Sequence, residues 1–268
     1  MDMPSFLVIG AMKCGTTTLT AELSRHPEIF TPPSKEPETL IRFGDDLDRI
    51  RADYRSLFAA APRASLLGEA STAYTKRPIY EGVAERAAAL CGNHLKVIYM
   101  VRDPVARILS HYNHEYNSGK ENRTIERAVA ENPIYIEYSR YEYQLEPWIS
   151  KFPKGSVFVL HLEHYQADPN AALVELQNFL GVKSVVNTLS TGARLNASSN
   201  RRVARGASKA LIASRFYQRR IKPIFPGPLK TVARYAFPKA SLAATSIDPR
   251  LEANLRQRLQ APPPGGQY

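Results

Sequence analysis

A glycine-bounded loop near the amino terminus carries the residue types that bind a phosphate group. Gly10 and Gly15 enclose four residues, one of them Lys13, and a threonine run follows directly: Thr16, Thr17 and Thr18. At a helix start, such a loop offers backbone N–H groups and the positive end of the helix dipole to an anion. The spacing is that of a nucleotide-kinase loop, but Thr16 stands where the kinase lysine would follow the second glycine. The alternative is an ordinary strand–turn–helix unit that contains a lysine by chance.

A second phosphate ligand is indicated at the end of an apolar run farther along the chain. Residues 95–101 have the length and composition of a buried strand, and Arg102 follows at once. Ser110 lies about two turns into the helix that Asp103 caps and Pro104 begins. Because open α/β sheets bind ligands at the carboxyl ends of their strands, we expect the guanidinium and the hydroxyl to meet an anion there.

Glu36 is the candidate general base. It lies in a proline-stiffened loop between Lys35 and Pro37, so its backbone is restricted and its carboxylate can be held near an acceptor. A carboxylate in that position can take the proton that a hydroxyl or an amine loses when it attacks. The alternative is a surface ion pair between Glu36 and Lys35. If Glu36 is not the base, the role would pass to His111, His114 or Glu69.

Strands that alternate with helices must position these groups. We predict strands at residues 6–9, 65–69, 95–101 and 157–162, and helices from residue 16 and at residues 45–58, 78–90, 104–115, 140–151 and 168–180. This order predicts an α/β fold with a P-loop-type, mainly parallel sheet flanked by helices. We expect residues 1–205 to form this single domain, residues 206–260 to form a basic helical extension and residues 261–268 to form a disordered tail.

Composition narrows the class of protein. The chain has 268 residues, of which 44% are apolar, and no apolar run approaches the roughly 20 residues of a membrane span. Cys14 and Cys91 do not make a disulfide framework, and neither has a spacing typical of a metal site. Because no signal peptide is indicated either, we expect a cytoplasmic protein.

The net charge of +11 is concentrated near the carboxyl end. Between Leu176 and Ile247 there are thirteen Lys and Arg and no Asp or Glu, which leaves the preceding residues mildly acidic. A basic end on an acidic body suggests an anionic partner, such as an acidic acceptor, membrane headgroups or nucleic acid. The alternative is a solvated basic face.

Four pieces of the sequence, in this order and spacing, resemble one enzyme family. They are Gly10-Ala-Met-Lys-Cys-Gly-Thr-Thr-Thr-Leu19, Ser34-Lys-Glu-Pro37, Gly68-Glu-Ala-Ser-Thr-Ala-Tyr74 and Val101-Arg-Asp-Pro-Val-Ala-Arg-Ile-Leu-Ser-His-Tyr112. Over about residues 5–205 the chain resembles the sulfotransferases that use 3′-phosphoadenosine-5′-phosphosulfate (PAPS). The similarity is greatest to the branch with the heparan-sulfate-type and many bacterial carbohydrate or metabolite sulfotransferases.

The resemblance implies an enzyme that uses PAPS, releases the desulfated product PAP and needs no metal. It implies that Arg102 and Ser110 hold the 3′-phosphate, and that Glu36 stands at the position taken as the general base. Lys13 would lie near the bridging oxygen of the leaving phosphate and so act in catalysis. The basic loop with Asn196, Ser198, Arg201 and Arg202 resembles the segment that closes over the donor. The residues that would hold the 5′-phosphosulfate are Lys13, Cys14, Gly15, Thr16, Thr17 and Thr18.

Two features depart from known members of that branch. Glycosaminoglycan-modifying members often carry a lysine where this chain has Ala70, which argues against a heparan-like acceptor. Golgi members also have an amino-terminal membrane anchor, which we do not expect here. The acceptor stays open among sugar hydroxyls, amines, phenols and lipid-linked glycans, and the oligomeric state is open too.

Two other functions fit parts of the sequence. A P-loop small-molecule kinase would use ATP and Mg²⁺, but Thr16 and the second phosphate site at Arg102 and Ser110 argue against it. A non-catalytic nucleic-acid-binding protein would use the basic residues 176–247, where aromatics are few and no base-reading module is found. We therefore expect a small-molecule or glycan acceptor and no specific nucleic acid, with the basic region available to a membrane or an acidic acceptor.

Overall fold

The computed structural model describes residues 3–63, 65–185 and 246–261. Its centre is a five-stranded sheet in the order β2-β3-β1-β4-β5, in which every pair of neighbours is parallel. The strands are β1 (Phe6–Gly10), β2 (Ile29–Phe30), β3 (Leu66–Ala70), β4 (Lys96–Val101) and β5 (Val157–His161). The predicted α/β fold with a parallel sheet is confirmed. Only the two-residue strand β2 had no signal in the sequence, because it is too short to show a pattern.

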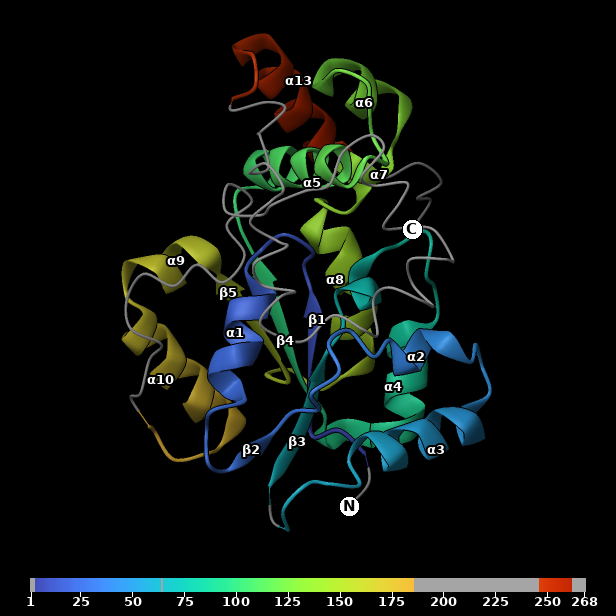
Figure 1. The fold of residues 1–268 in the computed structure, drawn as a ribbon, viewed down its shortest axis with the longest axis vertical. Coiled ribbons are helices and arrows are strands. Elements are labelled where there is room, and N and C mark those ends of the chain that lie inside the picture. The colour runs from blue at the N-terminus through green and yellow to red at the C-terminus, as the bar shows by residue number, and fades with distance from the viewer. Residues whose placement is uncertain (1–2, 64, 186–245, 262–268) are drawn as a thin grey trace, which may run out of the picture.

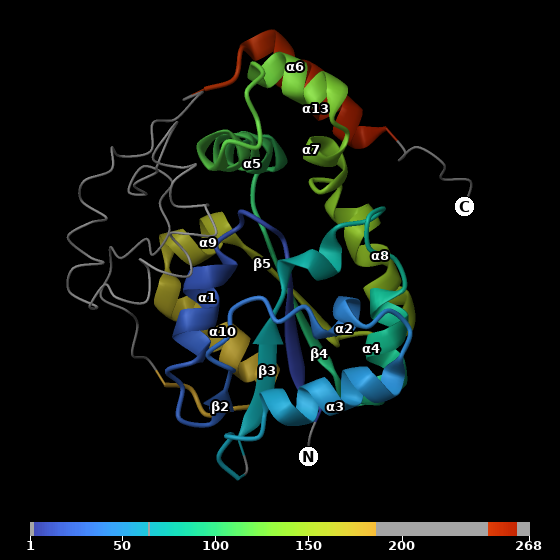
Figure 2. The same ribbon diagram turned by 45° about the vertical axis from the view of Figure 1, so that its right-hand side comes forward.

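Helices cover both faces of this sheet (Figures 1 and 2). One face carries α1 (Thr16–Leu23), α9 (Leu162–Ala167) and α10 (Pro169–Leu180). The other carries α2 (Thr39–Arg42), α3 (Leu47–Leu57), α4 (Val83–Cys91) and α8 (Tyr141–Lys151), with the 3-10 turns η1 (Thr72–Thr75) and η2 (Gly92–His94) in the connections. Because β1 is covered on both sides, all five of its residues are buried, which explains why it is continuously apolar.

Four further helices lie beyond the carboxyl ends of the strands and have an apolar core of their own. They are α5 (Pro104–Ser118), α6 (Ile125–Glu131), α7 (Ile134–Glu137) and α13 (Pro249–Gln260). Ile108, Ile136 and Leu255 meet in this second core, which joins the carboxyl-terminal helix to α5 and α7. The part of the predicted basic extension that the structure describes is thus helical and packed. The remainder of residues 206–260, and the predicted tail, lie outside the described residues.

Most predicted helices are confirmed with small shifts at their ends. The aspartates expected as caps do cap: Asp103 accepts from the backbone N–H of Ala106 and Asp168 from that of Ala171, at 2.7 and 3.0 Å. The predicted helix at residues 78–90 is wrong at its start, because α4 begins at Val83. Gly82 before it has a φ of 73°, which a continuing helix does not allow.

The residues that precede α4 are held by another helix instead. Arg77 donates its backbone N–H to Gln144 of α8 at 2.9 Å and accepts the Gln144 amide on its carbonyl at the same distance. The Arg77 side chain also donates to the carbonyl of Tyr143 and to Glu146. With its backbone paired to α8, this segment forms a turn rather than the first turn of a helix.

The strand order reverses about β1. From β1 the chain proceeds to β2 and β3 on one side and then to β4 and β5 on the other. In open parallel sheets, ligands bind outside the carboxyl ends of the strands at such a reversal. The Gly10 loop, the end of β4 and the η1 turn after β3 all lie at this edge.

Candidate active site

Both glycines of the predicted phosphate loop are required by the geometry. Gly10 has a φ of 151°, and a Cβ there would stand 2.1 Å from the Thr75 hydroxyl oxygen of η1. Gly15 has a φ of 94°, and a Cβ there would stand 2.9 Å from Leu162. Any side chain would therefore have to displace a neighbour and also adopt a strained backbone. The loop follows the end of β1 closely and opens α1, as the sequence predicted.

The loop leaves backbone donors without acceptors. Within the described ranges, the backbone N–H groups of Gly15, Thr16 and Thr17 donate no hydrogen bond. Lys13 lies in the same loop with a φ of 74°. Three N–H groups at a helix start, with a lysine beside them, form an arrangement that binds an anion.

Arg102 joins this loop from the end of β4. Its Nη1 lies 3.4 Å from the carbonyl oxygen of Lys13. Its Nε is buried and has no hydrogen-bond partner among the residues that the structure describes. Asp103 beside it instead caps α5 and pairs with Arg256 of α13 at 3.0 Å. Because a buried donor without an acceptor is costly, Arg102 has the chemistry of a site that an anion completes.

Ser110 and Cys14 differ in what they can offer to such an anion. Ser110 lies on α5, half-buried, two helical turns after Arg102. The Cys14 thiol is buried, 3.6 Å from the Tyr141 hydroxyl, and its burial raises the pKa of the thiol to about 11. Cys14 could therefore contact a ligand through its backbone only, and its thiol is not a nucleophile.

Glu36 is bound by the η1 turn, and its partner is not the lysine beside it. Its Oε2 accepts from the backbone N–H of Thr72 at 2.7 Å and from the Thr72 hydroxyl at 3.0 Å. The alternative of a surface pair with Lys35 is wrong, because Lys35 donates to the Thr17 hydroxyl at 2.7 Å. That bond ties the loop of Glu36 to the start of α1. Oε1 of Glu36 has no hydrogen-bond partner in the described part of the chain.

Two of the three substitute bases are enclosed in the protein. Glu69 is 1% exposed, and burial raises its pKa to about 7. His111 is 2% exposed and lies between the rings of Tyr135 and Tyr138, and burial together with nearby Arg107 lowers its pKa to about 2. Neither side chain can reach an acceptor in this structure. His114, the third, is half-buried on α5, 4.0 Å from the Glu115 carboxylate.

Two residues near Glu36 had no assigned role in the sequence. Thr72 holds the carboxylate, and only its place in the Gly68–Tyr74 piece could have drawn attention to it. Lys76, at the end of η1, is half-buried with Glu36, Glu38 and Glu115 within electrostatic range. Its pKa is lowered, chiefly by burial, although these carboxylates oppose the shift. Its ammonium adds a positive charge on the base side of the site.

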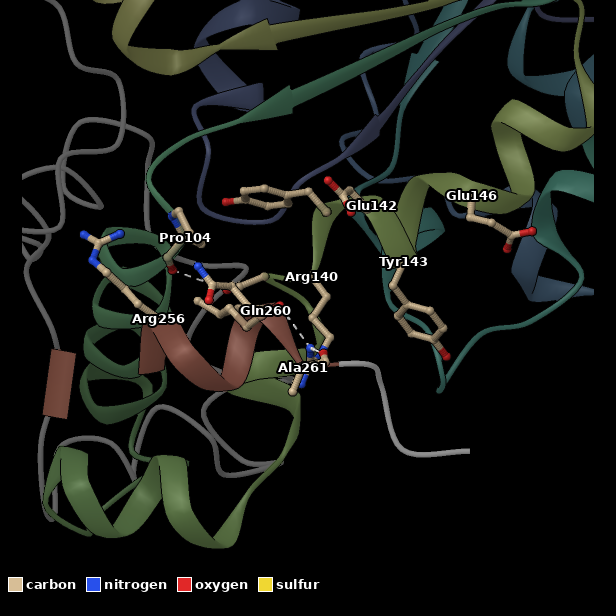
Figure 3. A pocket seen from close by; sticks show the side chains of 11 residues that line it. Pro104, Arg140, Glu142, Tyr143, Glu146, Arg256, Gln260 and Ala261 are labelled. Atoms are coloured by element: carbon tan, nitrogen blue, oxygen red, sulfur yellow. Dashed lines mark hydrogen bonds between the residues drawn. The ribbon is translucent and has the colours of Figure 1, made fainter. Parts of the chain in front are cut away.

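A cavity of about 750 Å³ lies next to this site, between α8 and α13 (Figure 3). Its wall includes Pro104, which follows Asp103, and Tyr141, whose hydroxyl contacts Cys14. Among the residues that the structure describes, none of those predicted to bind the donor or to act as the base lines it. The cavity therefore adjoins the donor loop without being part of it.

Some predictions cannot be placed in the structure. Arg201 and Arg202, with Asn196 and Ser198, lie outside the described residues. In the ranges that are described, no cluster of His, Cys, Asp or Glu is arranged to hold a metal ion. No helix among those residues has the length and apolar character needed to cross a bilayer.

Comparison with known proteins gives one consistent family. The model of the sulfotransferase domain family matches residues 3–221. Heparan sulfate glucosamine 3-O-sulfotransferase 3B1 of Mus musculus is 27% identical over 196 residues, which cover 69% of this chain and 48% of that protein. The bifunctional heparan sulfate N-deacetylase/N-sulfotransferase 2 of the same organism is 26% identical over 204 residues, 69% of this chain and 23% of that protein. This chain thus matches about half the length of the first relative and about a quarter of the second.

A solved structure supports the same grouping. The sulfotransferase from Alicyclobacillus acidocaldarius superimposes with a TM-score of 0.62 and 26% sequence identity. The superposition covers 72% of this chain and 86% of that one. The match therefore spans most of the described α/β body.

Proposed function

The chain belongs to the sulfotransferase domain family, and on that basis we propose that it transfers a sulfuryl group from PAPS to a hydroxyl or amine of a carbohydrate or small-metabolite acceptor. One observation carries the proposal. Among the residues that the structure describes, the loop has backbone donors without acceptors, Arg102 has an Nε without one, and Glu36 keeps one carboxylate oxygen without a partner. The bond from Lys35 to Thr17 joins the loop of Glu36 to the start of α1, so the three lie at one edge of the sheet. The first two suit a donor with two phosphate groups, and the third suits an acceptor that must lose a proton.

The donor would be held by the loop and by the end of β4. Lys13, the backbone N–H groups of Gly15 to Thr17 and the Thr18 hydroxyl fit the 5′-phosphosulfate, since all belong to the loop or to the first turn of α1. Arg102 and Ser110 fit the 3′-phosphate, the group that distinguishes this donor from ATP. The Nε of Arg102, which has no partner among the described residues, supports that assignment, because a phosphate oxygen would satisfy it.

The chain's own groups account for the transfer step. As the acceptor oxygen or nitrogen bonds to sulfur, its proton passes to the Glu36 carboxylate, which Thr72 holds by Oε2. The bond between sulfur and the bridging oxygen of the phosphosulfate breaks, and negative charge grows on that oxygen. Lys13 and the loop N–H groups are placed to stabilise that charge. A sulfuryl group carries one negative charge fewer than a phosphoryl group. A lysine and backbone N–H groups can therefore stabilise the charge for which phosphoryl transfer usually recruits Mg²⁺.

The acceptor we propose is a glycan or a small metabolite. The names of the two mouse relatives refer to heparan sulfate, which supports a glycan acceptor for this chain. Ala70, at a position where glycan-modifying relatives often carry a lysine, argues against a polyanionic one. We therefore propose a glycan or a small metabolite of low negative charge.

A ligand-binding experiment separates this proposal from its rivals. Thermal unfolding would be followed with PAP, with ATP and Mg²⁺, and with duplex DNA. We expect PAP without metal to stabilise the protein, by about 2.7 kcal/mol at a concentration a hundred times its Kd, and ATP to have little effect. Stabilisation by ATP and Mg²⁺ alone would favour the kinase, and tight, steeply salt-dependent DNA binding would favour the nucleic-acid-binding protein.

The acceptor would then be sought directly. Radiolabelled sulfate on PAPS would be offered with panels of neutral glycans, amino sugars, phenols and sulfated glycans. We expect label to move to a member of the first three panels. Transfer only to the sulfated glycans would contradict the charge argument from Ala70 while leaving the sulfotransferase activity intact.

A further inference from the structure

A buried carboxylate that the transfer step does not use lies beneath the base loop. Glu69, in β3, is 1% exposed and pairs in register with Leu7 of the central strand. Three hydroxyl groups donate to it: that of Tyr74 at 2.5 Å, that of Ser71 at 2.8 Å and that of Tyr54 at 3.2 Å. A charge in this position is expensive unless hydrogen bonds compensate it, and a well-packed apolar side chain would often be as stable. Stability alone therefore does not explain a carboxylate at this position.

Two of these hydroxyls extend to the loop of Glu36. The backbone N–H of Glu38 donates to the Ser71 hydroxyl at 3.0 Å, and the backbone N–H of Leu40 donates to the Tyr74 hydroxyl at 3.2 Å. The Ser71 hydroxyl therefore accepts from the loop, the Tyr74 hydroxyl accepts from the first turn of α2 that follows it, and both hydroxyls donate to Glu69. Two chains of hydrogen bonds run from the backbone of residues 38–40, through Ser71 and Tyr74, to one carboxylate. In a protein interior, each bond in such a chain strengthens the next.

The loop needs this support because its backbone is strained. Glu36 has a φ of 53° and Glu38 a φ of 55°, the left-handed region that residues with a side chain rarely adopt. Each such residue is strained and persists only where its surroundings hold it. The two N–H groups that are tied to the network belong to Glu38 itself and to Leu40, just after the strained pair.

The same short segment also holds the carboxylate of Glu36. Thr72, which binds Oε2 of Glu36, lies between Ser71 and Tyr74. One stretch of the chain thus binds the side chain of the base with one residue and its backbone with two others. Both backbone ties end on Glu69.

We propose that Glu69 is a positioning residue for Glu36, acting through Ser71 and Tyr74 to hold the base loop in its left-handed conformation. The proposal rests on the proposed role of Glu36 as general base. It assigns no proton transfer to Glu69, which stays enclosed. Loss of either chain should let the loop relax and move the carboxylate from the acceptor, because small misplacements of a catalytic group are costly.

The protein contains a matched pair of variants for the test. Tyr74→Phe removes a buried hydroxyl that donates to Glu69 and also accepts from the backbone of Leu40, just after the loop. Tyr54→Phe removes a buried hydroxyl that donates to the same oxygen of Glu69 and also bonds to the Tyr74 hydroxyl, but among the described residues no hydrogen bond joins Tyr54 directly to residues 36–40. Ser71→Ala breaks the second chain with a smaller change in volume and serves if Tyr74→Phe folds poorly. Glu69→Gln alters the common end of both chains while preserving shape.

Two readouts are needed, of which only one depends on activity. Amide hydrogen exchange over residues 36–40 reports whether the loop is held, and turnover at saturating PAPS with the Kd for PAP reports whether the base is placed. For Tyr74→Phe, Ser71→Ala and Glu69→Gln we expect faster exchange, a turnover lower by about tenfold or more and a Kd within about twofold. For Tyr54→Phe we expect exchange in this loop and turnover both within about twofold of the unaltered protein.

Equal effects of Tyr54→Phe and Tyr74→Phe on the loop would overturn the proposal. So would faster exchange in the loop with undiminished turnover, since the position of the loop would then not matter to the reaction. Failure of the proposed function is a different result. In that case the unaltered protein would transfer no sulfate from PAPS, while the exchange measurements would still report whether Glu69 holds the loop.

Discussion

The donor side of the site and its base side are held in place by different means. The donor side, residues 10–18 with Arg102, owes its shape to the backbone: two glycines that approach their neighbours closely and a helix start whose N–H groups have no acceptor in the part of the chain that the structure describes. The base side, residues 34–38, has no glycine, yet it places Glu36 and Glu38 in the left-handed region. Side chains of η1, and of Ser71 just before it, hold it there. The shape of the donor side depends on its own backbone, and the shape of the base side depends on side chains that are distant in the sequence.

The difference predicts how each side fails. Substitutions on the donor side should change the affinity for PAP or the stabilisation of the leaving group. Substitutions on the base side should leave PAP binding nearly unchanged and lower the rate of transfer. The predictions below test that separation.

Glu36→Gln should give the largest effect. Glutamine keeps the shape and the bonds from Thr72 but cannot accept the acceptor's proton, so turnover should fall by roughly 10² to 10⁴. Steady-state kinetics at saturating PAPS would measure it. Glu38→Gln is the matched control, because it removes the same charge from the same loop, and its loss of turnover should be far smaller. Near-normal turnover in Glu36→Gln would transfer the role of base to His114, the substitute that is not enclosed.

Lys13→Ala should lower turnover by about 10², and the affinity for PAP much less. The charge that Lys13 stabilises develops only as the bond to sulfur breaks, so its loss should appear in the rate rather than in binding. Lys35→Ala removes a nearby lysine that bonds to Thr17 and should cost less. If Lys13→Ala weakened PAP binding as much as turnover, its role would be to hold the donor.

The sequence predicted the local structure of the donor side well because that structure depends on residues close together in the chain. The glycine spacing, the start of α1, Arg102 at the end of β4 and the Asp103 cap all lie within two short segments whose residues act on their immediate neighbours. The glycines had to be glycines for a reason visible only in three dimensions, the approach of Thr75 and Leu162. The pattern nevertheless identified them.

The sequence predicted the position of Glu36 but not what holds it. Thr72 lies 36 residues from Glu36, and Ser71 lies 33 residues from Glu38, so these bonds depend on the order of β2, β3 and β1 in the sheet. No periodicity encodes that order. For the same reason, Glu69 seemed available as a base, since the two tyrosines that enclose it come from α3 and η1. The sequence also could not predict that Arg140 binds α13 through the carbonyls of Leu259 and Ala261.

Stability should depend on pH through Glu69. Its pKa rises from 4.5 to about 7 in the folded protein, mainly because of burial, so the folded state binds more protons than the unfolded state within that window. Stability should therefore fall as the pH rises from 4.5 to about 7, by on the order of 3 kcal/mol at most, and level off above.

The other groups that face Glu69 are Tyr54, Tyr74, Ser71, Glu36 and Cys91, and the comparison with Glu69→Gln separates the titration of Glu69 from theirs. Burial raises the pKa of both tyrosines well above the usual value and that of Cys91 to about 12, so these three stay neutral throughout the window. Urea unfolding at several pH values would compare the protein with Glu69→Gln, whose profile should be flatter. Parallel profiles would show that Glu69 does not titrate in this window.

The separation of the two sides is tested most directly by calorimetric titration of PAP into the unaltered protein, Arg102→Ala and Glu36→Gln. We expect Arg102→Ala to weaken the binding of PAP by roughly 2 to 4 kcal/mol, because it removes a charge-assisted bond to the 3′-phosphate. The binding of a ligand without that phosphate should be almost unaffected. Glu36→Gln should bind PAP within about twofold of the unaltered protein. Equal weakening in the two variants, or equal weakening of both ligands by Arg102→Ala, would contradict the account.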